Sequence, residues 1–451
     1  MGQRPGDLAS MPRNPDPAQH PHAAATESTR ALNAAKLDRL FAAPLVGALA
    51  GHSDGATALA RPPSSLRTAL TGAADGEVAL WSLPLRSKLA SLSSHSGLVR
   101  GVSFCPSLPS SLCASCADDS SLRFWRLDDA RVSLPVGGSS SLASSPSTPK
   151  LSPIATRRCK HSYRDVDFSH DSQQILLAAC GASLDLFHPE RRKPFASLST
   201  GADTSTCVRF NPAEPSILAS CGSDRAVALY DARQASQLRR IVLLARPNAT
   251  SWNPREPFNF VAACEDSNLY SFDMRKLDSA LVVHRDFVSS VLDVDFSPNG
   301  TEFAACSFDR TIRIFGKSDW QSREVYHTKR MQRVSCVRFT ADASYLISAS
   351  EEGNARLWKA NASAQSGTNL PQEKKKRAYE KALMKRYAHV PAVRRIARKR
   401  LVPRGIHKAQ RKRQAMEKSA ARKRENLRQH SKAGDVPHKA VRREHVVGQE
   451  E

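Results

Sequence analysis

Long apolar segments and cofactor-binding motifs are missing from this 451-residue sequence. No run of 18 or more apolar residues occurs, and the first twenty residues lack the apolar core of a signal peptide. No GxxxxGKS/T or GxGxxG motif follows a strand and opens a helix. We therefore expect a soluble protein that is not secreted, with no membrane partner, no cofactor and no small-molecule substrate.

Metal-binding and catalytic patterns are also missing. The ten cysteines lack the spacing of a disulfide framework, which favours a reducing compartment. Cys113 and Cys116 form a CxxC pair, but no second pair of ligands lies at the spacing of a zinc site. Cys116, Cys221 and Cys306 each precede a turn aspartate by three residues. This recurrence predicts small buried strand residues, and nothing in the chain predicts an enzyme.

Acidic residues are scarce in one part of the chain. Residues 374–443 contain 26 lysines and arginines against four acidic residues, a net charge of +22, whereas the whole chain carries +24. The sequence therefore divides into a nearly neutral body and a basic C-terminal segment. Three explanations fit such a charge run: binding to RNA phosphates, recognition by a nuclear import receptor, or a helix surrounded only by water.

A short pattern recurs seven times in the body. A small or acidic turn residue is followed six positions later by an aromatic residue that ends an alternating strand. These closing aromatic residues are 42 to 44 positions apart, except for one gap of 62. A propeller blade of four strands needs about 40 to 45 residues. The closing residues are Trp81, Trp125, Phe187, Tyr230, Phe272, Phe315 and Trp358.

The repeats resemble those of the WD40 family, which implies an all-β fold, a seven-bladed β-propeller. In that family a turn aspartate, a strand serine or threonine, a histidine and the closing tryptophan form a buried hydrogen-bonded set. His52, His95 and either His284 or His327 resemble the histidine of this set. The repetition favours a structural role over a catalytic one, because an active site is needed only once. The turn aspartates are Asp75, Asp119, Asp224, Asp266 and Asp309.

The repeats also set the predicted domain boundaries. The propeller spans 43–360, and residues 44–50 supply the missing strand of its last blade, because the chain after Trp358 is typical of a loop. Residues 134–153, rich in serine and proline, form a disordered insertion that serves as a linker or a phosphorylation site. The other predicted segments are an N-terminal extension at 1–42 with a short helix near 29–41, a linker at 361–373, a basic and mainly α-helical domain at 374–443, and a tail at 444–451.

Two adjacent repeats end in an unusual way. Their closing aromatic residues are followed by aspartate, any residue, and arginine: Asp231 and Arg233 in the first repeat, Asp273 and Arg275 in the second. This ending resembles the box by which some WD40 proteins dock onto the adaptor of a cullin-RING ubiquitin ligase. The alternative is that both aspartates hold tight turns while the arginines are solvated.

Helical spacing predicts three helices in the basic segment. Tyr379, Leu383 and Tyr387 recur every four residues, Pro391 suits a helix start, and a third helix at about 406–429 has few apolar positions. The stretch RYAHVPAVRRIARKRLVPRGIHKAQ, together with RALNAAKLDRLFAAPLVGALAGHSDG near the N-terminus, resembles the Sof family of nucleolar WD-repeat proteins. The resemblance covers most of the chain.

Membership of that family implies a non-catalytic scaffold of the small-subunit processome in the nucleolus, and hence in the nucleus. Its partners would be pre-rRNA, the ribonucleoprotein that contains U3 small nucleolar RNA, and other processome proteins, and its task would be 18S rRNA maturation in the biogenesis of the small ribosomal subunit. The alternative function is that of a substrate receptor for a cullin-RING ligase of the CUL4–DDB1 type.

The basic segment supplies the candidate residues for RNA binding and nuclear import. Phosphate contacts by these cations would be strongly salt-dependent and would read little sequence, because the segment has few aromatic residues for base stacking. The cations predicted to contact RNA are Arg394, Arg395, Arg398, Lys399, Arg400, Arg404, Lys408, Arg411, Lys412, Arg413, Arg422, Lys423 and Arg424. The predicted import signal is Lys374, Lys375, Lys376 and Arg377.

Overall fold

The computed structural model describes the chain with several gaps. The described residues are 19, 21–63, 65–92, 95–106, 112–127, 150–171, 177–198, 204–234, 236–364, 367–368, 370–432, 435–436, 438 and 440–450. They form two compact units. One unit contains the described residues up to Ala43 together with Ala362–Lys399, and the other contains Pro44–Asn361 together with the described residues from Arg400 onward.

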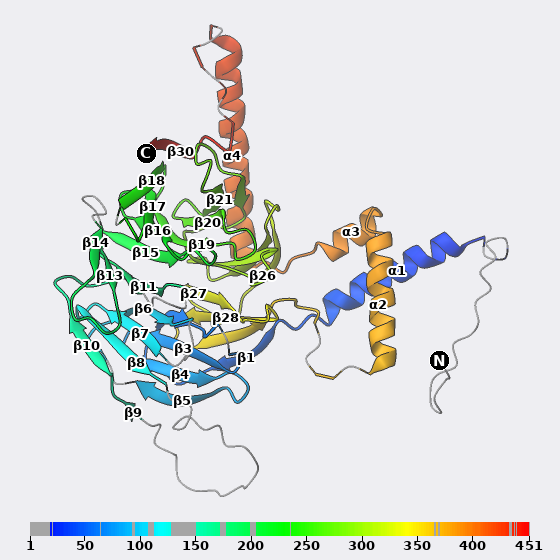
Figure 1. Ribbon diagram of the computed structural model, residues 1–451. Coiled ribbons are helices and arrows are strands. Elements are labelled where there is room, and N and C mark those ends of the chain that lie inside the picture. Colours follow the sequence, from blue (N-terminus) through cyan, green and yellow to red (C-terminus); the bar gives the residue numbers. More distant parts are fainter. Residues whose placement is uncertain are drawn as a thin grey trace, which may run out of the picture. The chain divides into compact units, whose positions relative to one another are not determined.

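Seven sheets in the larger unit form the blades of a propeller, which confirms the predicted fold (Figure 1). The first two blades are β2 (Ala56–Ala60), β3 (Thr68–Ala73), β4 (Val78–Ser82) and β5 (Ser87–Leu92), then β6 (Val99–Phe104), β7 (Leu112–Ala117), β8 (Ser121–Arg126) and β10 (Ala155–Arg158). The third and fourth are β11 (Asp165–Phe168), β12 (Leu177–Cys180), β13 (Leu184–Phe187) and β14 (Ala196–Leu198), then β15 (Ser205–Phe210), β16 (Ile217–Gly222), β17 (Ala226–Asp231) and β18 (Ser236–Leu243). The fifth and sixth are β19 (Pro247–Trp252), β20 (Asn259–Cys264), β21 (Asn268–Asp273) and β22 (Val282–Arg285), then β23 (Val291–Phe296), β24 (Glu302–Ser307), β25 (Ile312–Gly316) and β26 (Ser322–Tyr326).

The seventh blade joins the two ends of the propeller. It contains β27 (Val334–Phe339), β28 (Tyr345–Ser350) and β29 (Ala355–Lys359), and its fourth strand is β1 (Leu45–Leu49). β1 pairs antiparallel with β29, so that Leu45 lies opposite Trp358 and Leu49 opposite Ala355. The strand expected at 44–50 thus completes this sheet and removes the open edge that a three-stranded last blade would leave.

The turn before each closing strand has a common geometry. In five blades an aspartate carboxylate accepts a hydrogen bond from the backbone N–H two residues later, at 2.9–3.1 Å. The residue between them has a positive φ, which costs least for Gly76 and is also adopted by Ser120, Arg225, Ser267 and Arg310. The five aspartates are Asp75, Asp119, Asp224, Asp266 and Asp309.

The buried histidine set forms in full in the second blade and in part in the first. In the second blade His95 contacts Asp119 at 3.0 Å and Ser115 at 2.8 Å, and the indole N–H of Trp125 donates to Ser115 at 2.9 Å. In the first blade His52 and Trp81 both contact the hydroxyl of Thr71.

The expectation that His284 or His327 occupies the same position is wrong. His284 lies in an outer strand, where its Nδ1 donates to the carbonyl of Asp319 at 2.6 Å and its Nε2 contacts Ser271 at 2.9 Å. His327 lies just beyond outer strand β26. Neither histidine pairs with a turn aspartate among the described residues, because His284 lies within the outer strand of the fifth blade and His327 directly follows that of the sixth.

Polar side chains link the inner strands of neighbouring blades. The sequence DVDF occurs in β11 and again in β23, and each copy faces the sequence CVRF in the inner strand of the next blade. In the first pair Asp167 accepts from the Phe210 backbone N–H at 2.9 Å, and in the second Asp295 accepts from the Phe339 N–H at 2.8 Å. These contacts tie the third blade to the fourth and the sixth to the seventh.

Two strands extend blades beyond four members. β9 (Lys150–Leu151) pairs with β5, and β30 (Val446–Glu450) pairs antiparallel with β18. Most of the insertion expected at 134–153 lies outside the described residues, but its last part contains β9 and is therefore not irregular throughout. The tail expected at 444–451 also contains a strand, because β18 offers it an open edge.

The smaller unit contains three helices, α1 (Ala23–Leu40), α2 (Pro371–Arg386) and α3 (Pro391–Ala397). Leu383, Tyr387 and Val393 pack with Ala31 and Ala35 in one apolar cluster. α1 begins six residues before the helix expected near 29–41, because the alanines at its start favour helix.

The third helix of the basic segment, α4 (Arg404–His430), belongs to the propeller unit and not to the unit of α2 and α3. The basic segment expected at 374–443 is thus divided between the two compact units. The physical reason is that α2 and α3 have an apolar face that packs on α1, whereas none of the side chains of α4 is buried.

Candidate nucleic-acid and protein interfaces

A buried carboxylate of the sixth blade anchors the segment that contains α4. The carboxylate of Asp286, 3% exposed, pairs with Arg313 at 2.9 Å. It also accepts a hydrogen bond from Arg400 and one from the side-chain amide of Gln410, the latter at 2.6 Å. Arg400 donates further to the hydroxyl of Ser322 at 2.8 Å. Both ends of this contact are charged or polar, and α4 has no fully buried side chain that could attach it by apolar packing alone.

The electrostatics of this cluster favour the ionised carboxylate. Burial raises the pKa of Asp286, but the positive charges of Arg313 and Arg400 lower it by more, so that the net shift is downward. Removing one partner from such a buried pair leaves an uncompensated charge, which costs about 3–5 kcal/mol. We refer to Asp286, Arg313, Ser322, Arg400 and Gln410 as the Asp286 cluster.

A second arginine of the basic segment binds the fifth blade. Arg413 donates to the carbonyls of Phe287 and Asp266 at 2.9 and 3.1 Å, and to the side chain of Asn268 at 3.0 Å. Arg400 and Arg413 were both expected to contact RNA, but these contacts use their guanidinium groups within the propeller unit. Charge alone did not separate them from the exposed cations.

The strand after α4 completes the attachment. β30 adds a fifth strand to the fourth blade, with Ile241 opposite Gln449. The ring of His445, just before it, lies 4.9 Å from that of Tyr270. Arg424, on α4, donates to Glu444 at 2.7 Å. The C-terminal segment is thus tied to the fourth, fifth and sixth blades.

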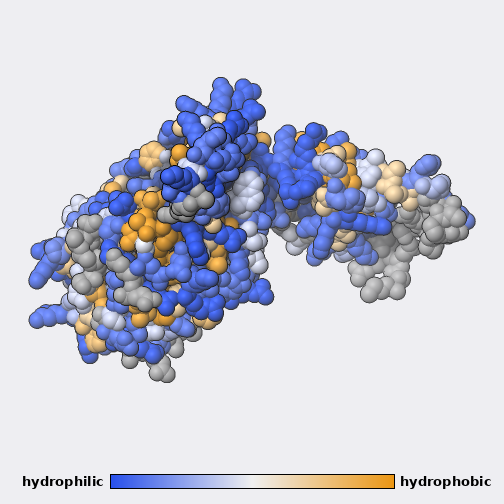
Figure 2. Space-filling view, turned by 90° about the horizontal axis from the view of Figure 1, so that it is seen from above, coloured by the Kyte–Doolittle hydropathy of each residue, from blue (hydrophilic) through white to orange (hydrophobic). Residues whose placement is uncertain are grey.

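One side of α4 is lined with exposed cations. The docking side contains Gln410 and Arg413, and a residue three, four or seven positions away lies on the same side of a helix. The opposite side, which we call the outer face, contains Arg404, Lys408, Arg411, Lys412, Lys418, Arg422 and Lys423, all exposed. These residues span about 28 Å along the helix. Figure 2 shows that much of the surface seen from above is hydrophilic, with apolar residues gathered in patches on the propeller.

Among the described residues, no acidic side chain forms an ion pair with a cation of the outer face. The two acids of α4, Glu417 and Glu425, pair with Arg413 and Arg428 at 2.9 and 2.6 Å. Like charges three or four positions apart destabilise a helix by a few tenths of a kcal/mol per pair. An anion bound along the outer face would relieve this repulsion.

The other predicted cations lie in the smaller unit. Arg394 and Arg395 lie in α3, Arg398 and Lys399 follow it, and all four are exposed. The predicted import signal lies in the first turns of α2, where Lys374, Lys375 and Lys376 are exposed and Arg377 is half-buried. Arg424 is 59% exposed although it is paired with Glu444.

The two candidate docking turns are similar in backbone and different in their arginines. Asp231 and Asp273 accept a hydrogen bond from the backbone N–H of Arg233 and Arg275, at 2.9 and 3.0 Å. Both arginines are exposed. Arg275 also forms a two-pronged ion pair with Asp273 and lies 4.5 Å from the ring centre of Phe258, which is 40% exposed.

Charge, hydrogen bonding and aromatic contact therefore hold Arg275 in one orientation on the surface. The hydrogen bond and ion pair from Arg275 lower the pKa of Asp273. No comparable side-chain contact orients Arg233 among the described residues. The turn of the fifth blade thus holds its arginine by more side-chain contacts than the turn of the fourth blade does.

Sequence reasoning missed Asp286, Gln410 and the junction aspartates. Nothing in the sequence singles out Asp286, because it belongs to no repeated pattern and lies 114 positions from Arg400. The junctions did leave a signal: the identical tetrapeptides DVDF at 165–168 and 293–296, each followed one blade later by CVRF.

Potential metal ligands do not cluster in the described part of the chain. No group of three or more histidine, cysteine or acidic side chains there is arranged to hold a metal ion. The thiols of Cys113 and Cys116 are fully buried in β7, and burial raises the pKa of both. No described helix is long and apolar enough to cross a membrane.

The fold and the attached basic helix define a WD-repeat propeller protein with a C-terminal extension. The WD domain, G-beta repeat family matches residues 86–126, 278–316 and 322–359, and the Sof1-like domain family matches residues 360–446.

Full-length relatives agree with these matches. The chain is 42% identical to the DDB1- and CUL4-associated factor 13 of Danio rerio and to that of Homo sapiens, over 441 residues that cover 98% of this chain and 95% of each relative. It is 40% identical to Protein SOF1 of Saccharomyces cerevisiae over 450 residues, which cover 98% of this chain and 90% of the relative. The chain belongs to this Sof1-type family, and the resemblance drawn from its sequence is confirmed.

Proposed function

We propose that this protein is a non-catalytic scaffold of the small-subunit processome in the nucleolus, where it supports 18S rRNA maturation. The propeller would bind other processome proteins, and the outer face of α4 would bind pre-rRNA. Membership of the family supports the proposed role in the processome. The exposed cations of the outer face support the proposal that α4 binds RNA. The exposed lysines at the start of α2 would serve in nuclear import.

The outer face suits the RNA backbone more than the bases. It has no aromatic side chain on which a base could stack, and a straight row of cations matches phosphates along a helical strand. If its seven cations each met a phosphate, the affinity would fall by roughly 10³-fold or more between 50 and 200 mM salt. Arg400 and Arg413 would not contribute, because their guanidinium groups bind the propeller.

The RNA assignment is tested with the full chain and a structured rRNA hairpin. The triple variant Lys408→Glu, Arg411→Glu, Arg422→Glu should weaken binding at least about tenfold and flatten its salt dependence. The matched control reverses three exposed cations of the third blade, Arg191, Arg192 and Lys193, and should retain the affinity of the wild type. Equal losses in both variants would show that binding follows net charge alone and would refute the assignment to α4.

A second candidate function is that of a substrate receptor of a cullin-RING ligase. It is supported by the relatives named DDB1- and CUL4-associated factor 13 and by the ordered, exposed Arg275 beside Phe258. In this proposal the fifth-blade turn binds the adaptor DDB1, with the fourth-blade Arg233 in support.

Co-purification with DDB1 tests this docking site. The variant Arg275→Glu should reduce recovery of the adaptor more than Arg233→Glu, and Arg192→Glu should leave recovery unchanged. None of these changes touches α4, so RNA binding should stay at the level of the wild type in all three. Full recovery of DDB1 with the double variant Arg233→Glu, Arg275→Glu would refute docking through these turns.

A further inference from the structure

The inner strands of the propeller enclose a cavity that neither proposed function uses. Its volume is about 140 Å³, and all seven blades contribute to its wall through β2, β6, β11, β15, β19, β23 and β27 or the residues next to them. It therefore lies on the axis of the propeller. No part of α4 and neither docking turn lines it.

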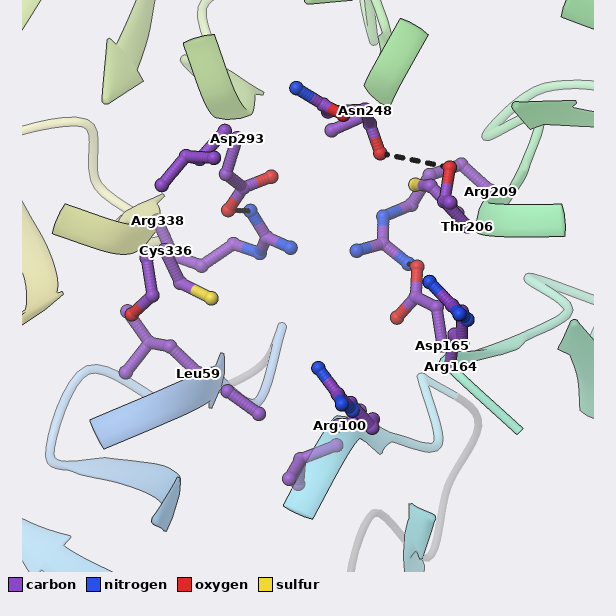
Figure 3. Close-up of a pocket in the computed structure, with 17 residues that line it drawn as sticks. Leu59, Arg100, Arg164, Asp165, Thr206, Arg209, Asn248, Asp293, Cys336 and Arg338 are labelled. Carbon is purple, nitrogen blue, oxygen red and sulfur yellow. Dashed lines mark hydrogen bonds and ion pairs between the residues drawn. The ribbon is translucent and has the colours of Figure 1, made fainter. Parts of the chain in front are cut away.

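Arginines dominate the charged groups of this wall. Arg100, Arg164, Arg209 and Arg338 line the cavity, against the carboxylates of Asp165 and Asp293. Figure 3 shows the guanidinium groups of Arg209 and Arg338 pointing into the cavity from opposite sides, with Arg100 entering from a third side. Positive charge thus converges on this open cavity.

The two carboxylates are occupied by the wall itself. Asp165 accepts from Arg209 Nη1 at 2.6 Å and from the Val208 N–H at 3.3 Å. Asp293 repeats the arrangement with Arg338 Nη1 at 2.5 Å and the Val337 N–H at 3.1 Å. The carboxylates therefore hold their arginines in place by one nitrogen each.

The remaining nitrogens of these arginines are available to a ligand. Within the described residues, Nε and Nη2 of Arg209 and Arg338 have no hydrogen-bond acceptor, and the side chain of Arg164 has no carboxylate partner. Arg100 donates from Nε and Nη2 to Asp118 at 2.8–3.1 Å, in a pair that is about 40% exposed at both ends, so that within the described residues its Nη1 is the nitrogen left for a ligand. A fixed, forked donor is the arrangement that binds oxyanions best.

We propose that the axial cavity binds a compact phosphate anion, with pyrophosphate as its simplest probe. Donors on three sides suit an anion whose oxygens point in several directions, which a planar carboxylate does not offer. A compact phosphate anion fits a space of about 140 Å³. The anion would brace the second, third and fourth blades, which supply Arg100, Arg164 and Arg209, against the seventh, which supplies Arg338.

Calorimetric titration of the full chain with pyrophosphate, in a buffer free of other phosphates, tests this site. The wild type should bind one pyrophosphate saturably. The variant Arg100→Ala, Arg164→Ala should weaken binding at least about tenfold, since it removes two charged donors without touching the blade junctions. The charge-retaining variant Arg100→Lys, Arg164→Lys should bind between these limits, because lysine keeps the charge but not the fork.

A matched control removes two exposed arginines outside the cavity. Arg333 pairs with Glu351 at 2.9 Å and is 50% exposed, much like Arg100 with Asp118, and Arg255 is also exposed. The variant Arg255→Ala, Arg333→Ala should stay within about twofold of the wild type. Loss of affinity in this control would overturn the proposal, as would wild-type affinity in Arg100→Ala, Arg164→Ala. The melting temperature of every variant is measured without ligand, and pyrophosphate should raise it only where binding persists.

Two further measurements separate this site from the RNA face. The α4 triple variant Lys408→Glu, Arg411→Glu, Arg422→Glu should bind pyrophosphate as the wild type does, even though it loses the rRNA hairpin. The hairpin should not displace pyrophosphate from the wild type. If the α4 variant lost pyrophosphate, or the hairpin displaced it, the anion would be bound on α4 or belong to RNA, and the axial site would be refuted. Absence of saturable binding to the wild type would refute it outright.

Discussion

The two halves of the basic segment have similar charge and opposite modes of attachment. α2 and α3 pack on α1 through apolar side chains such as Leu383, Tyr387 and Val393. α4 has no buried side chain, and it is held to the propeller by Arg400, Gln410 and Arg413. In the first half the cations take no part in the attachment to α1, whereas in the second half Arg400 and Arg413 form the attachment to the propeller.

This difference decides which cations are available to a partner. The cluster that attaches α2 and α3 to α1 contains apolar side chains and no charged one. Arg394 and Arg395 therefore stay exposed. In α4 the charges divide by face, and only the outer face is open to RNA. A charged attachment also depends on pH and on its partner carboxylate, and an apolar one does not. The two halves can therefore be perturbed separately.

The largest effect is expected from removing the carboxylate that anchors α4. Asp286→Ala leaves Arg313 buried without its main partner and should lower the free energy of unfolding of the propeller unit by about 3–5 kcal/mol. Hydrogen exchange should become faster in α4 and stay unchanged in α2. The control Asp118→Ala breaks an exposed pair and should cost at most about 1 kcal/mol. Unchanged protection of α4 in Asp286→Ala would show that the Asp286 cluster does not hold the helix.

A comparable change in the other half should have the reverse pattern. Leu383 is 5% exposed within the cluster of α1, α2 and α3. Leu383→Ala should destabilise that unit by about 3 kcal/mol, because it opens a cavity among packed side chains. Exchange should then become faster in α2 and remain as it was in α4. Leu427→Ala, on α4 and 58% exposed, is the matched control and should change stability by less than about 0.5 kcal/mol.

The two halves also differ in how much of them the sequence predicts. The spacing of Tyr379, Leu383 and Tyr387 predicts an apolar face, and that face packs as expected for Leu383 and Tyr387. The docking side of α4 has no such signature, because Gln410 and Arg413 look like any other polar residues of a basic helix. Only the position of Asp286 in the folded propeller distinguishes them.

The propeller shows the same contrast between repeated and single features. The turn aspartates and closing aromatic residues recur at one period, so seven weak signals reinforce one another. The pairing of β30 with β18 joins segments about two hundred residues apart and occurs once, which leaves no period to detect. His284 shows the limit of matching a residue type alone, since its partners are Ser271 and the Asp319 carbonyl.

A smaller effect is expected from acid, which should weaken the charged attachment selectively. The pKa of Asp286 is lowered in the folded protein, so its ionised form adds stability that is fully present above the usual value of 3.8 and is lost as the pH falls through the folded pKa. The variant Asp286→Asn keeps the shape of the side chain without its charge. It should be less stable than the wild type by about 2 kcal/mol at pH 7.

The difference between the wild type and Asp286→Asn should shrink as urea unfolding is repeated at lower pH, towards and below 3.8. Leu383→Ala serves as the comparison, because the side chains around it in the apolar cluster are uncharged and its deficit should stay constant over the same range. A constant deficit for Asp286→Asn would contradict an ionic anchor.

The smallest effect distinguishes two arginines that lie two positions apart on α4. Arg411 lies on the outer face, and Arg413 donates to Phe287, Asp266 and Asn268 of the propeller unit. Arg411→Gln should reduce the slope of log affinity against log salt for the rRNA hairpin by about one, the share of a single phosphate contact. Arg413→Gln should leave that slope unchanged and instead speed hydrogen exchange in α4, because its charge serves the attachment. Equal slopes for both variants would mean that RNA does not distinguish the two faces of α4. The division into a docking side and an outer face would then have no bearing on RNA binding.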